Sequence, residues 1–112
     1  MSRDRESVFD IVDSISKILT YTAGMTMADF MASDEKQDAV LRRILVIGEA
    51  TKRLSPEFRQ RYPEIPWKEI AGTRDIIVHD YHRVDAERIW DVVQSDLPNL
   101  LNVLTSVDQE LQ

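Results

Sequence analysis

The residues most able to do chemistry lie together in one short stretch, TRDIIVHDYH, at residues 73–82. Arg74 can bind a phosphate through two parallel hydrogen bonds. His79 titrates near neutrality and can move a proton to or from a ribose 2′-hydroxyl or a leaving oxygen. Together they suffice for metal-free RNA cleavage, because the 2′-hydroxyl supplies its own nucleophile. We therefore take Arg74 and His79 as catalytic candidates and expect no cofactor.

Other chemistries have less support in the sequence. There is no cysteine, so no disulfide framework and no thiolate metal site is expected. The only two histidines are His79 and His82, which makes a poor case for zinc. No glycine-rich phosphate loop occurs. The competing interpretation of a lone helical histidine is a hydrogen-bonded or exposed polar residue without a catalytic role.

Helix geometry restricts how these side chains can meet. We expect Thr73 to cap a helix that carries Arg74 through Tyr81. At ~100° per residue, Arg74 and Tyr81 share a face, while Arg74 and His79 lie ~140° apart. Either Arg74 reaches round from a frayed first turn, or two copies of the motif meet across an interface. A symmetric homodimer is the simpler solution.

Apolar residues three and four apart predict the long helices that must position this stretch. The first runs from Val8 to about Gly24, where glycine can take the left-handed C-cap conformation. Thr26 and Asp29 resemble a capping box and predict a short helix through Phe30. Ser33 or Asp34 then starts a second long helix, whose apolar stripe runs from residue 40 to residue 54.

The second half predicts shorter elements and one more long helix. Ser55, followed by proline and glutamate, starts a helix that ends at residues 62–63, before a proline. One or two turns follow from residue 66 and end at Gly72. Asp85 caps the last helix, which Pro98 should kink or divide at Asp96. No alternating strand pattern occurs. We predict an all-α, up-down four-helix bundle with short extra helices, formed by residues 1–112 as a single domain.

Composition and charge limit which partners and which cellular location we expect. The 112 residues carry a net charge of −6, which argues against a general nucleic-acid coat. Residues 41–62 are locally basic, with 6 Lys/Arg against 2 Asp/Glu. These cations form either a solvated helix face, the interpretation we favour, or a strip that tracks phosphates. No membrane span and no signal-peptide core are apparent, so we expect a cytoplasmic protein.

The stretch DAVLRRILVIGEATKRLSPEFRQRYPEIPWKEIAGTRDIIVHDYHRVD, residues 38–85, resembles the HepT-like branch of the HEPN superfamily. The opening amphipathic helix and DLPNLL in the last helix agree with it, so the resemblance covers nearly the whole chain. The family motif is Arg, four residues, His, any residue and Tyr. Here it falls on Arg74, His79 and Tyr81, and it follows IGEA, RLSPEF and YPEIPWKEIAG.

This resemblance implies a homodimeric four-helix-bundle ribonuclease toxin of a type VII-like pair, with RNA as its substrate and the active site between protomers. It also implies an antitoxin partner, a small MntA-type nucleotidyltransferase. In this family that enzyme transfers AMP from ATP to the motif tyrosine, which here is Tyr81. The implied protein is thus a metal-independent endoribonuclease that is neutralised by adenylylation of Tyr81.

Two positions depart from the commonest family pattern. Asp75 stands where asparagine usually follows the arginine, and it either weakens phosphate binding or serves as an acid at the helix N-terminus. His82 stands where an aromatic residue usually follows the tyrosine, and it is either a second proton-transfer group or a surface residue.

Two further interpretations remain open at this stage. One is a non-catalytic helical module that binds a nucleotide or a nucleotidyltransferase. The other is a purely structural bundle in which Arg74 pairs with an acid such as Asp75 or Asp80.

Overall fold

Three long helices and several short ones make up the computed structural model, which describes residues 2–72 and 85–111. Over these residues the chain is helical and contains no strand. The helices, in chain order, are α1 (Ser2–Thr22), α2 (Met27–Met31), α3 (Asp34–Lys52), α4 (Pro56–Arg61), α5 (Trp67–Ala71), α7 (Ala86–Asp91), the π-helix η1 (Val92–Asp96) and α8 (Leu97–Leu111). The predicted all-helical class is confirmed.

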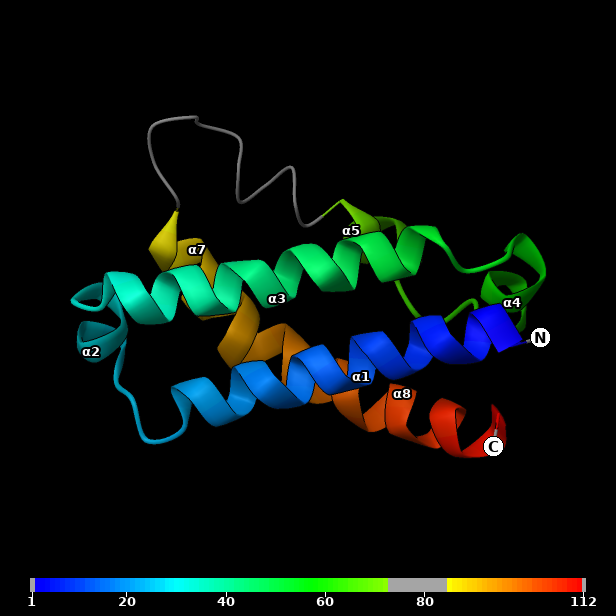
Figure 1. Ribbon diagram of the computed structural model, residues 1–112, viewed down its shortest axis with the longest axis horizontal. Helices are drawn as coiled ribbons and strands as arrows, with labels where there is room; N and C mark the ends of the chain where they lie inside the picture. Colours follow the sequence, from blue (N-terminus) through cyan, green and yellow to red (C-terminus); the bar gives the residue numbers. More distant parts are fainter. Residues whose placement is uncertain (1, 73–84, 112) are drawn as a thin grey trace.

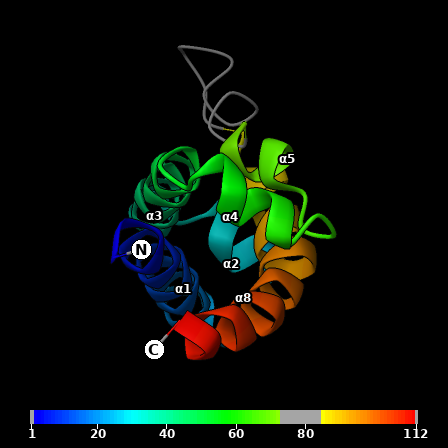
Figure 2. The ribbon, with the colours of Figure 1, turned by 90° about the vertical axis from the view of Figure 1, so that its right-hand side faces the viewer.

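The long helices α1, α3 and α8 run along the long axis of the molecule (Figure 1). α1 and α3 lie antiparallel and side by side, and α8 packs on α1. The view down the long axis shows α1 and α3 on one side and α5 and α8 on the other, with α5 above α8 (Figure 2). Both ends of the described chain lie at the same end of the bundle, and the short α2 closes the opposite end. Among the described helices, none is both long and apolar enough to cross a bilayer.

The core contains the apolar stripes predicted from residue spacing, together with apolar side chains of the short helices. Its buried members are Val8, Ile11, Ile15, Ile18, Phe30, Val40, Ile44, Ile47, Ala50, Leu54, Phe58, Ile65, Trp67, Ala86, Ile89, Val93, Leu97, Leu104 and Val107. They come from α1, α3, α8 and most of the short helices, so one apolar interior joins these elements. Burial of these side chains is the main favourable contribution to folding.

Most helix boundaries fall where capping chemistry predicted them. Gly24 adopts a left-handed conformation with φ of 76° after α1. Thr26 and Asp29 form the reciprocal capping box, and Ser33 and Ser55 each accept a hydrogen bond from a backbone N–H of the helix they start. α1 begins at Ser2, six residues before Val8, where the apolar pattern starts. Its first turns carry polar residues that the tertiary structure buries, which an apolar pattern cannot reveal.

The expected division of the last helix near Pro98 is also confirmed. α7 passes into the π-helix η1, and regular α-helix resumes at Leu97. Proline has no N–H and its ring clashes with the carbonyl four residues earlier, so the regular hydrogen-bond pattern cannot continue through it. The wider π turn directly before Pro98 accommodates this break.

Candidate functional site

The predicted site residues Arg74, Asp75, His79, Tyr81 and His82 all lie outside the described residues, as does the helix expected from Thr73. The structure does describe the two elements that flank this stretch in the chain. α5 ends with Gly72 as its C-cap, and α7 begins after the N-cap Asp85.

α5 is fixed to the rest of the bundle by Trp67. This side chain is only 7% exposed, and its indole Nε1–H donates to the carbonyls of Arg59 at 3.2 Å and Tyr62 at 3.1 Å. At the other end of α5, a Cβ placed on Gly48 would lie 3.5 Å from the Ala71 carbonyl oxygen. This is an ordinary van der Waals separation, so the end of α5 packs directly against α3 at Gly48.

α7 is fixed by a cap and by packing. The Asp85 side chain accepts a hydrogen bond from the Arg88 backbone N–H at 3.0 Å. Ala86 and Ile89 are buried, and the Trp90 ring lies 5.3 Å from the Phe30 ring, centroid to centroid. The chain just after the motif is therefore also packed against the bundle.

A groove of about 580 Å³ lies among α3, the residues before α5, α5 itself and the α7–η1–α8 segment. Its lining is mainly aliphatic, with a few charged or polar residues. The residues that line it are Ile44, Ile47, Glu64, Ile65, Pro66, Glu69, Ile70, Arg88, Val92, Asp96, Leu97, Asn99, Leu100 and Val103. A groove of this size is as large as many ligand sites.

The described lining of the groove does not suit RNA. Among the described residues, its charged members are the acids Glu64, Glu69 and Asp96 and one cation, Arg88, whereas phosphate binding needs a surplus of cations. Within residues 2–72 and 85–111, no group of histidine, aspartate and glutamate side chains could hold a metal ion. Apolar walls with sparse charges favour contact with another polypeptide surface instead.

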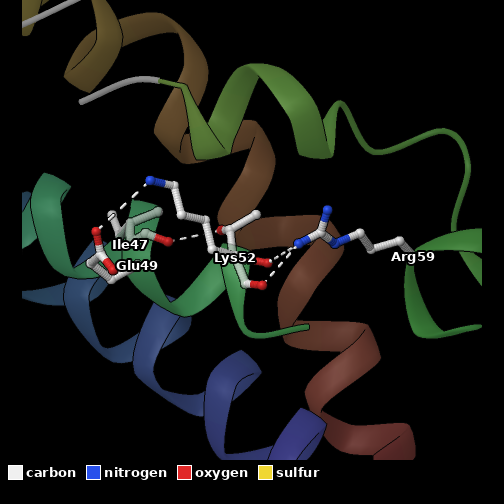
Figure 3. A network of polar contacts seen from close by, with 5 residues as sticks. Ile47, Glu49, Lys52 and Arg59 are labelled. Carbon is white, nitrogen blue, oxygen red and sulfur yellow. Dashed lines mark hydrogen bonds and ion pairs between the residues drawn. The ribbon is translucent and has the colours of Figure 1, made fainter. Parts of the chain in front are cut away.

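Several cations of the basic segment 41–62 make contacts within the protein. Arg59 donates through Nη2 to the carbonyl oxygens of Thr51 at 2.8 Å and Lys52 at 3.1 Å, which caps the end of α3 (Figure 3). Arg53 pairs with Asp10 at 3.2 Å. Lys52 lies 4.0 Å from a Glu49 carboxylate oxygen. Three of the six cations thus make contacts within the protein, which favours the solvated-face interpretation over a phosphate-tracking strip.

A buried polar contact joins the start of α1 to the start of α4. The Asp4 carboxylate accepts from the Ser55 backbone N–H at 2.9 Å and from the Ser55 hydroxyl at 2.7 Å. The same hydroxyl accepts from the Phe58 N–H at 3.1 Å. Ser55 therefore caps α4 and binds α1 at once.

A second long-range contact joins the end of α4 to α8. The Tyr62 hydroxyl donates to the Glu110 carboxylate at 2.8 Å. This hydrogen bond is the main cause that raises the pKa of Tyr62 above its ordinary value of 10.0, and desolvation adds to the shift. The residues around α4 thus act as structural connectors.

Comparison with known families now places the chain. The model of the family described as ribonuclease HepT-like matches residues 11–107, which include the whole motif stretch. The chain belongs to the ribonuclease HepT-like family. The resemblance inferred from the motif and its surroundings is thereby confirmed at the level of the family.

Individual relatives agree with this membership in the HepT-like family. A "Gamma-glutamylcyclotransferase and putative RNase" of Methanocaldococcus jannaschii is 46% identical over 101 residues, covering 90% of this chain and 46% of the relative. A "Putative RNase" of the same organism is 34% identical over 108 residues, covering 96% and 89%. A "Probable ribonuclease HepT" of Thermococcus cleftensis is 38% identical over 91 residues, covering 81% and 83%. The chain thus spans about half the length of the first of these relatives. No solved structure matches the chain significantly.

Sequence reasoning did not anticipate the groove. Its described lining comes from three separate stretches of the HepT-like chain, residues 44–47, 64–70 and 88–103, and only folding brings them together. The one local signal was Pro98, which predicted an irregularity in the last helix without indicating that a groove lies beside it.

Proposed function

We propose that this chain is an RNA endonuclease that works without a metal ion, with Arg74 and His79 as its catalytic residues. One observation carries the proposal: an Arg, four residues, His, any residue, Tyr motif lies within the part of the chain that the ribonuclease HepT-like family matches. The relatives named as ribonucleases support the same reaction class.

In the proposed reaction, His79 removes the proton from a ribose 2′-hydroxyl, and the oxygen attacks the adjacent phosphorus. The bond from phosphorus to the 5′-oxygen breaks, and that oxygen leaves with a proton supplied by an acid. The products are a 2′,3′-cyclic phosphate and a 5′-hydroxyl. Arg74 binds the non-bridging phosphate oxygens and stabilises the charge that develops on them. His82 is the candidate for the acid, and Asp75 is a candidate for positioning Arg74.

The active protein in this proposal is a homodimer. On one straight helix Arg74 and His79 would lie ~140° apart, so one copy does not bring them together. A two-fold axis that pairs two motifs would combine the arginine of one copy with the histidine of the other.

Regulation in this proposal works through Tyr81 and a partner, an MntA-type nucleotidyltransferase that acts as antitoxin to this toxin. The tyrosine oxygen attacks the α-phosphorus of ATP, forms a phosphodiester to AMP and releases pyrophosphate. The new phosphate is negatively charged and bulky, so it would occupy the Arg74 contact that RNA needs.

The alternative function is a helical module that binds a nucleotide or a nucleotidyltransferase and cleaves nothing. The observation in its favour is the groove, whose apolar walls and acidic residues suit a polypeptide better than RNA. Asp75 adds a further negative charge beside the proposed phosphate contact.

Cleavage of labelled RNA by purified protein in excess chelator tests the catalytic proposal. His79→Ala and Arg74→Ala should each lower the rate by ~100-fold or more, because each removes a group that acts in the transition state. Arg74→Lys should also be impaired, since lysine cannot make the planar two-point contact. His82→Ala should also lower the rate, because it removes the proposed acid. Lys68→Ala, which removes an exposed cation on α5 outside the motif, is the control. Activity abolished by the chelator, or retained by His79→Ala, would contradict the mechanism.

Incubation with the cognate nucleotidyltransferase and labelled ATP tests the regulatory proposal. The label should appear in the peptide that contains Tyr81 and should be absent from Tyr81→Phe. Tyr62→Phe and Tyr21→Phe serve as controls, because they remove the other two tyrosines. Modified protein that still cleaves RNA at the full rate would exclude Tyr81 as the switch.

A further inference from the structure

One wall of the groove carries charges in a symmetric order. Arg88 in α7, Val92 at the start of η1 and Asp96 at its end all line the groove. Arg88 and Asp96 are exposed, and within the described part of the chain neither forms an ion pair. We call these three residues the α7–η1 wall. A cation and an anion thus stand four residues on either side of a central valine.

The π-helix keeps the two charges on one face. In a regular α-helix, positions eight residues apart diverge by ~80° around the axis, because each residue turns by ~100°. A π turn takes more residues to complete, so each residue turns by less and the divergence shrinks. Arg88 and Asp96 consequently face the same groove. The irregularity before Pro98 therefore shapes a surface as well as interrupting a helix.

This order of charges is complementary to itself. If a second copy of the wall lies antiparallel, with a two-fold axis near Val92, then Arg88 of each copy faces Asp96 of the other. A parallel arrangement would place like charges together. The wall forms one side of the groove, so the axis that pairs the two walls also brings the two grooves face to face.

We propose that the α7–η1 wall and its groove form the two-fold contact between two copies of this chain. This rests on the homodimer of the proposed function and assigns it a surface. Aliphatic groove residues such as Ile70 and Leu100 supply the apolar contact, and the two Arg88–Asp96 pairs set the antiparallel direction. The wall begins at Arg88, nine residues after His79 in the sequence, so the contact lies close along the chain to the motif that the dimer is proposed to complete.

Charge reversal tests the contact on the full chain. We expect Arg88→Glu and Asp96→Arg each to raise the dimer dissociation constant by about tenfold, since two attractive pairs become two repulsive ones. The double variant R88E/D96R restores opposite charges across the axis and should return the constant to near the parent value. Sedimentation equilibrium over a dilution series measures all of these constants.

The controls reverse charges outside the groove. Lys68→Glu on α5 and Glu87→Arg on α7 are exposed residues that do not line it, and they match the two charge changes. Both should leave the dissociation constant unchanged, and circular dichroism should show every variant folded.

The outcomes separate this inference from the proposed function. The antiparallel contact would be overturned if the single reversals left the dimer dissociation constant unchanged, or if the double variant did not restore it. The homodimer and the nuclease would then still stand. A chain that is monomeric at all concentrations would overturn both the contact and the homodimer, while RNA cleavage by that monomer would still uphold the ribonuclease.

Discussion

The corner where α3 meets α4 and the groove between α5 and the η1–α8 segment treat charged residues in opposite ways. At the corner, the Asp4 carboxylate accepts two hydrogen bonds from Ser55, and Arg59 donates to two carbonyl oxygens at the end of α3. In the groove, Arg88 and Asp96 stand beside aliphatic walls and pair with no charge of the described chain.

This difference distinguishes charged residues whose hydrogen bonds stabilise the fold from exposed charged residues that form no ion pair within the described chain. A buried polar group costs free energy unless it is hydrogen-bonded, so the corner must satisfy its own charges. Exposed charges beside an apolar surface carry no such requirement within one chain. Their arrangement instead indicates which surface could face them. Stability measurements can therefore distinguish the two regions.

The largest expected effect is at the aromatic cluster of the corner. Phe58 is 2% exposed, and its ring lies 5.1 Å from that of Tyr62 and 5.9 Å from that of Trp67. Phe58→Ala should lower the free energy of unfolding by about 3–5 kcal/mol, because it removes buried contacts and leaves a cavity. Val103→Ala in the groove, where the side chain is 41% exposed in one copy, should change the free energy of unfolding of the monomer by no more than about 0.5 kcal/mol. Urea unfolding at a protein concentration below the dimer dissociation constant measures both variants. Equal losses would contradict the difference between the corner and the groove.

The next effect is at the charged contact of the same corner. Asp4 is only 8% exposed, so Asp4→Ala leaves the Ser55 backbone N–H without its acceptor. The expected loss is about 1.5–3 kcal/mol, the range for hydrogen bonds to a charged group. Glu64→Ala on the exposed side of the groove is the matched control and should cost less than about 0.5 kcal/mol. The same urea unfolding experiment measures both variants. If Asp4→Ala left the free energy of unfolding unchanged, the contact between α1 and α4 would contribute little to stability.

The smallest effect concerns the hydrogen bond from Tyr62 to Glu110. Folding raises the pKa of this phenol, so its contribution to stability is complete below the unfolded pKa of about 10 and is lost as pH rises through the folded value. Glu110→Gln should return the pKa of Tyr62 toward its ordinary value, because the carboxylate that accepts the proton is gone. A tyrosine titration followed by NMR measures this pKa. An unchanged pKa in Glu110→Gln would assign the shift to desolvation instead.

Several features of the fold were predictable because their causes are local. Gly24 takes a left-handed conformation that favours a residue without a Cβ, and Ser33, Ser55 and Asp85 each satisfy a backbone N–H three residues on. The motif of Arg74, His79 and Tyr81 is likewise a matter of spacing along the chain. Together with the preceding segments IGEA, RLSPEF and YPEIPWKEIAG it indicated the family, although the motif residues lie outside the part that the structure describes.

The sequence by itself thus determined the helices, their caps, the apolar stripes and the catalytic candidates, since each depends on residues a few positions apart. Only the tertiary structure decided which polar residues form hydrogen bonds within the protein and which line the groove. Asp4 meets Ser55 across 51 positions, and Ile47 and Val103 line the same groove across 56. Such contacts follow from how whole helices pack, and packing depends on the shapes of all their faces at once. The alignment of Arg88 with Asp96 required, in addition, the extra width of the π turn before Pro98.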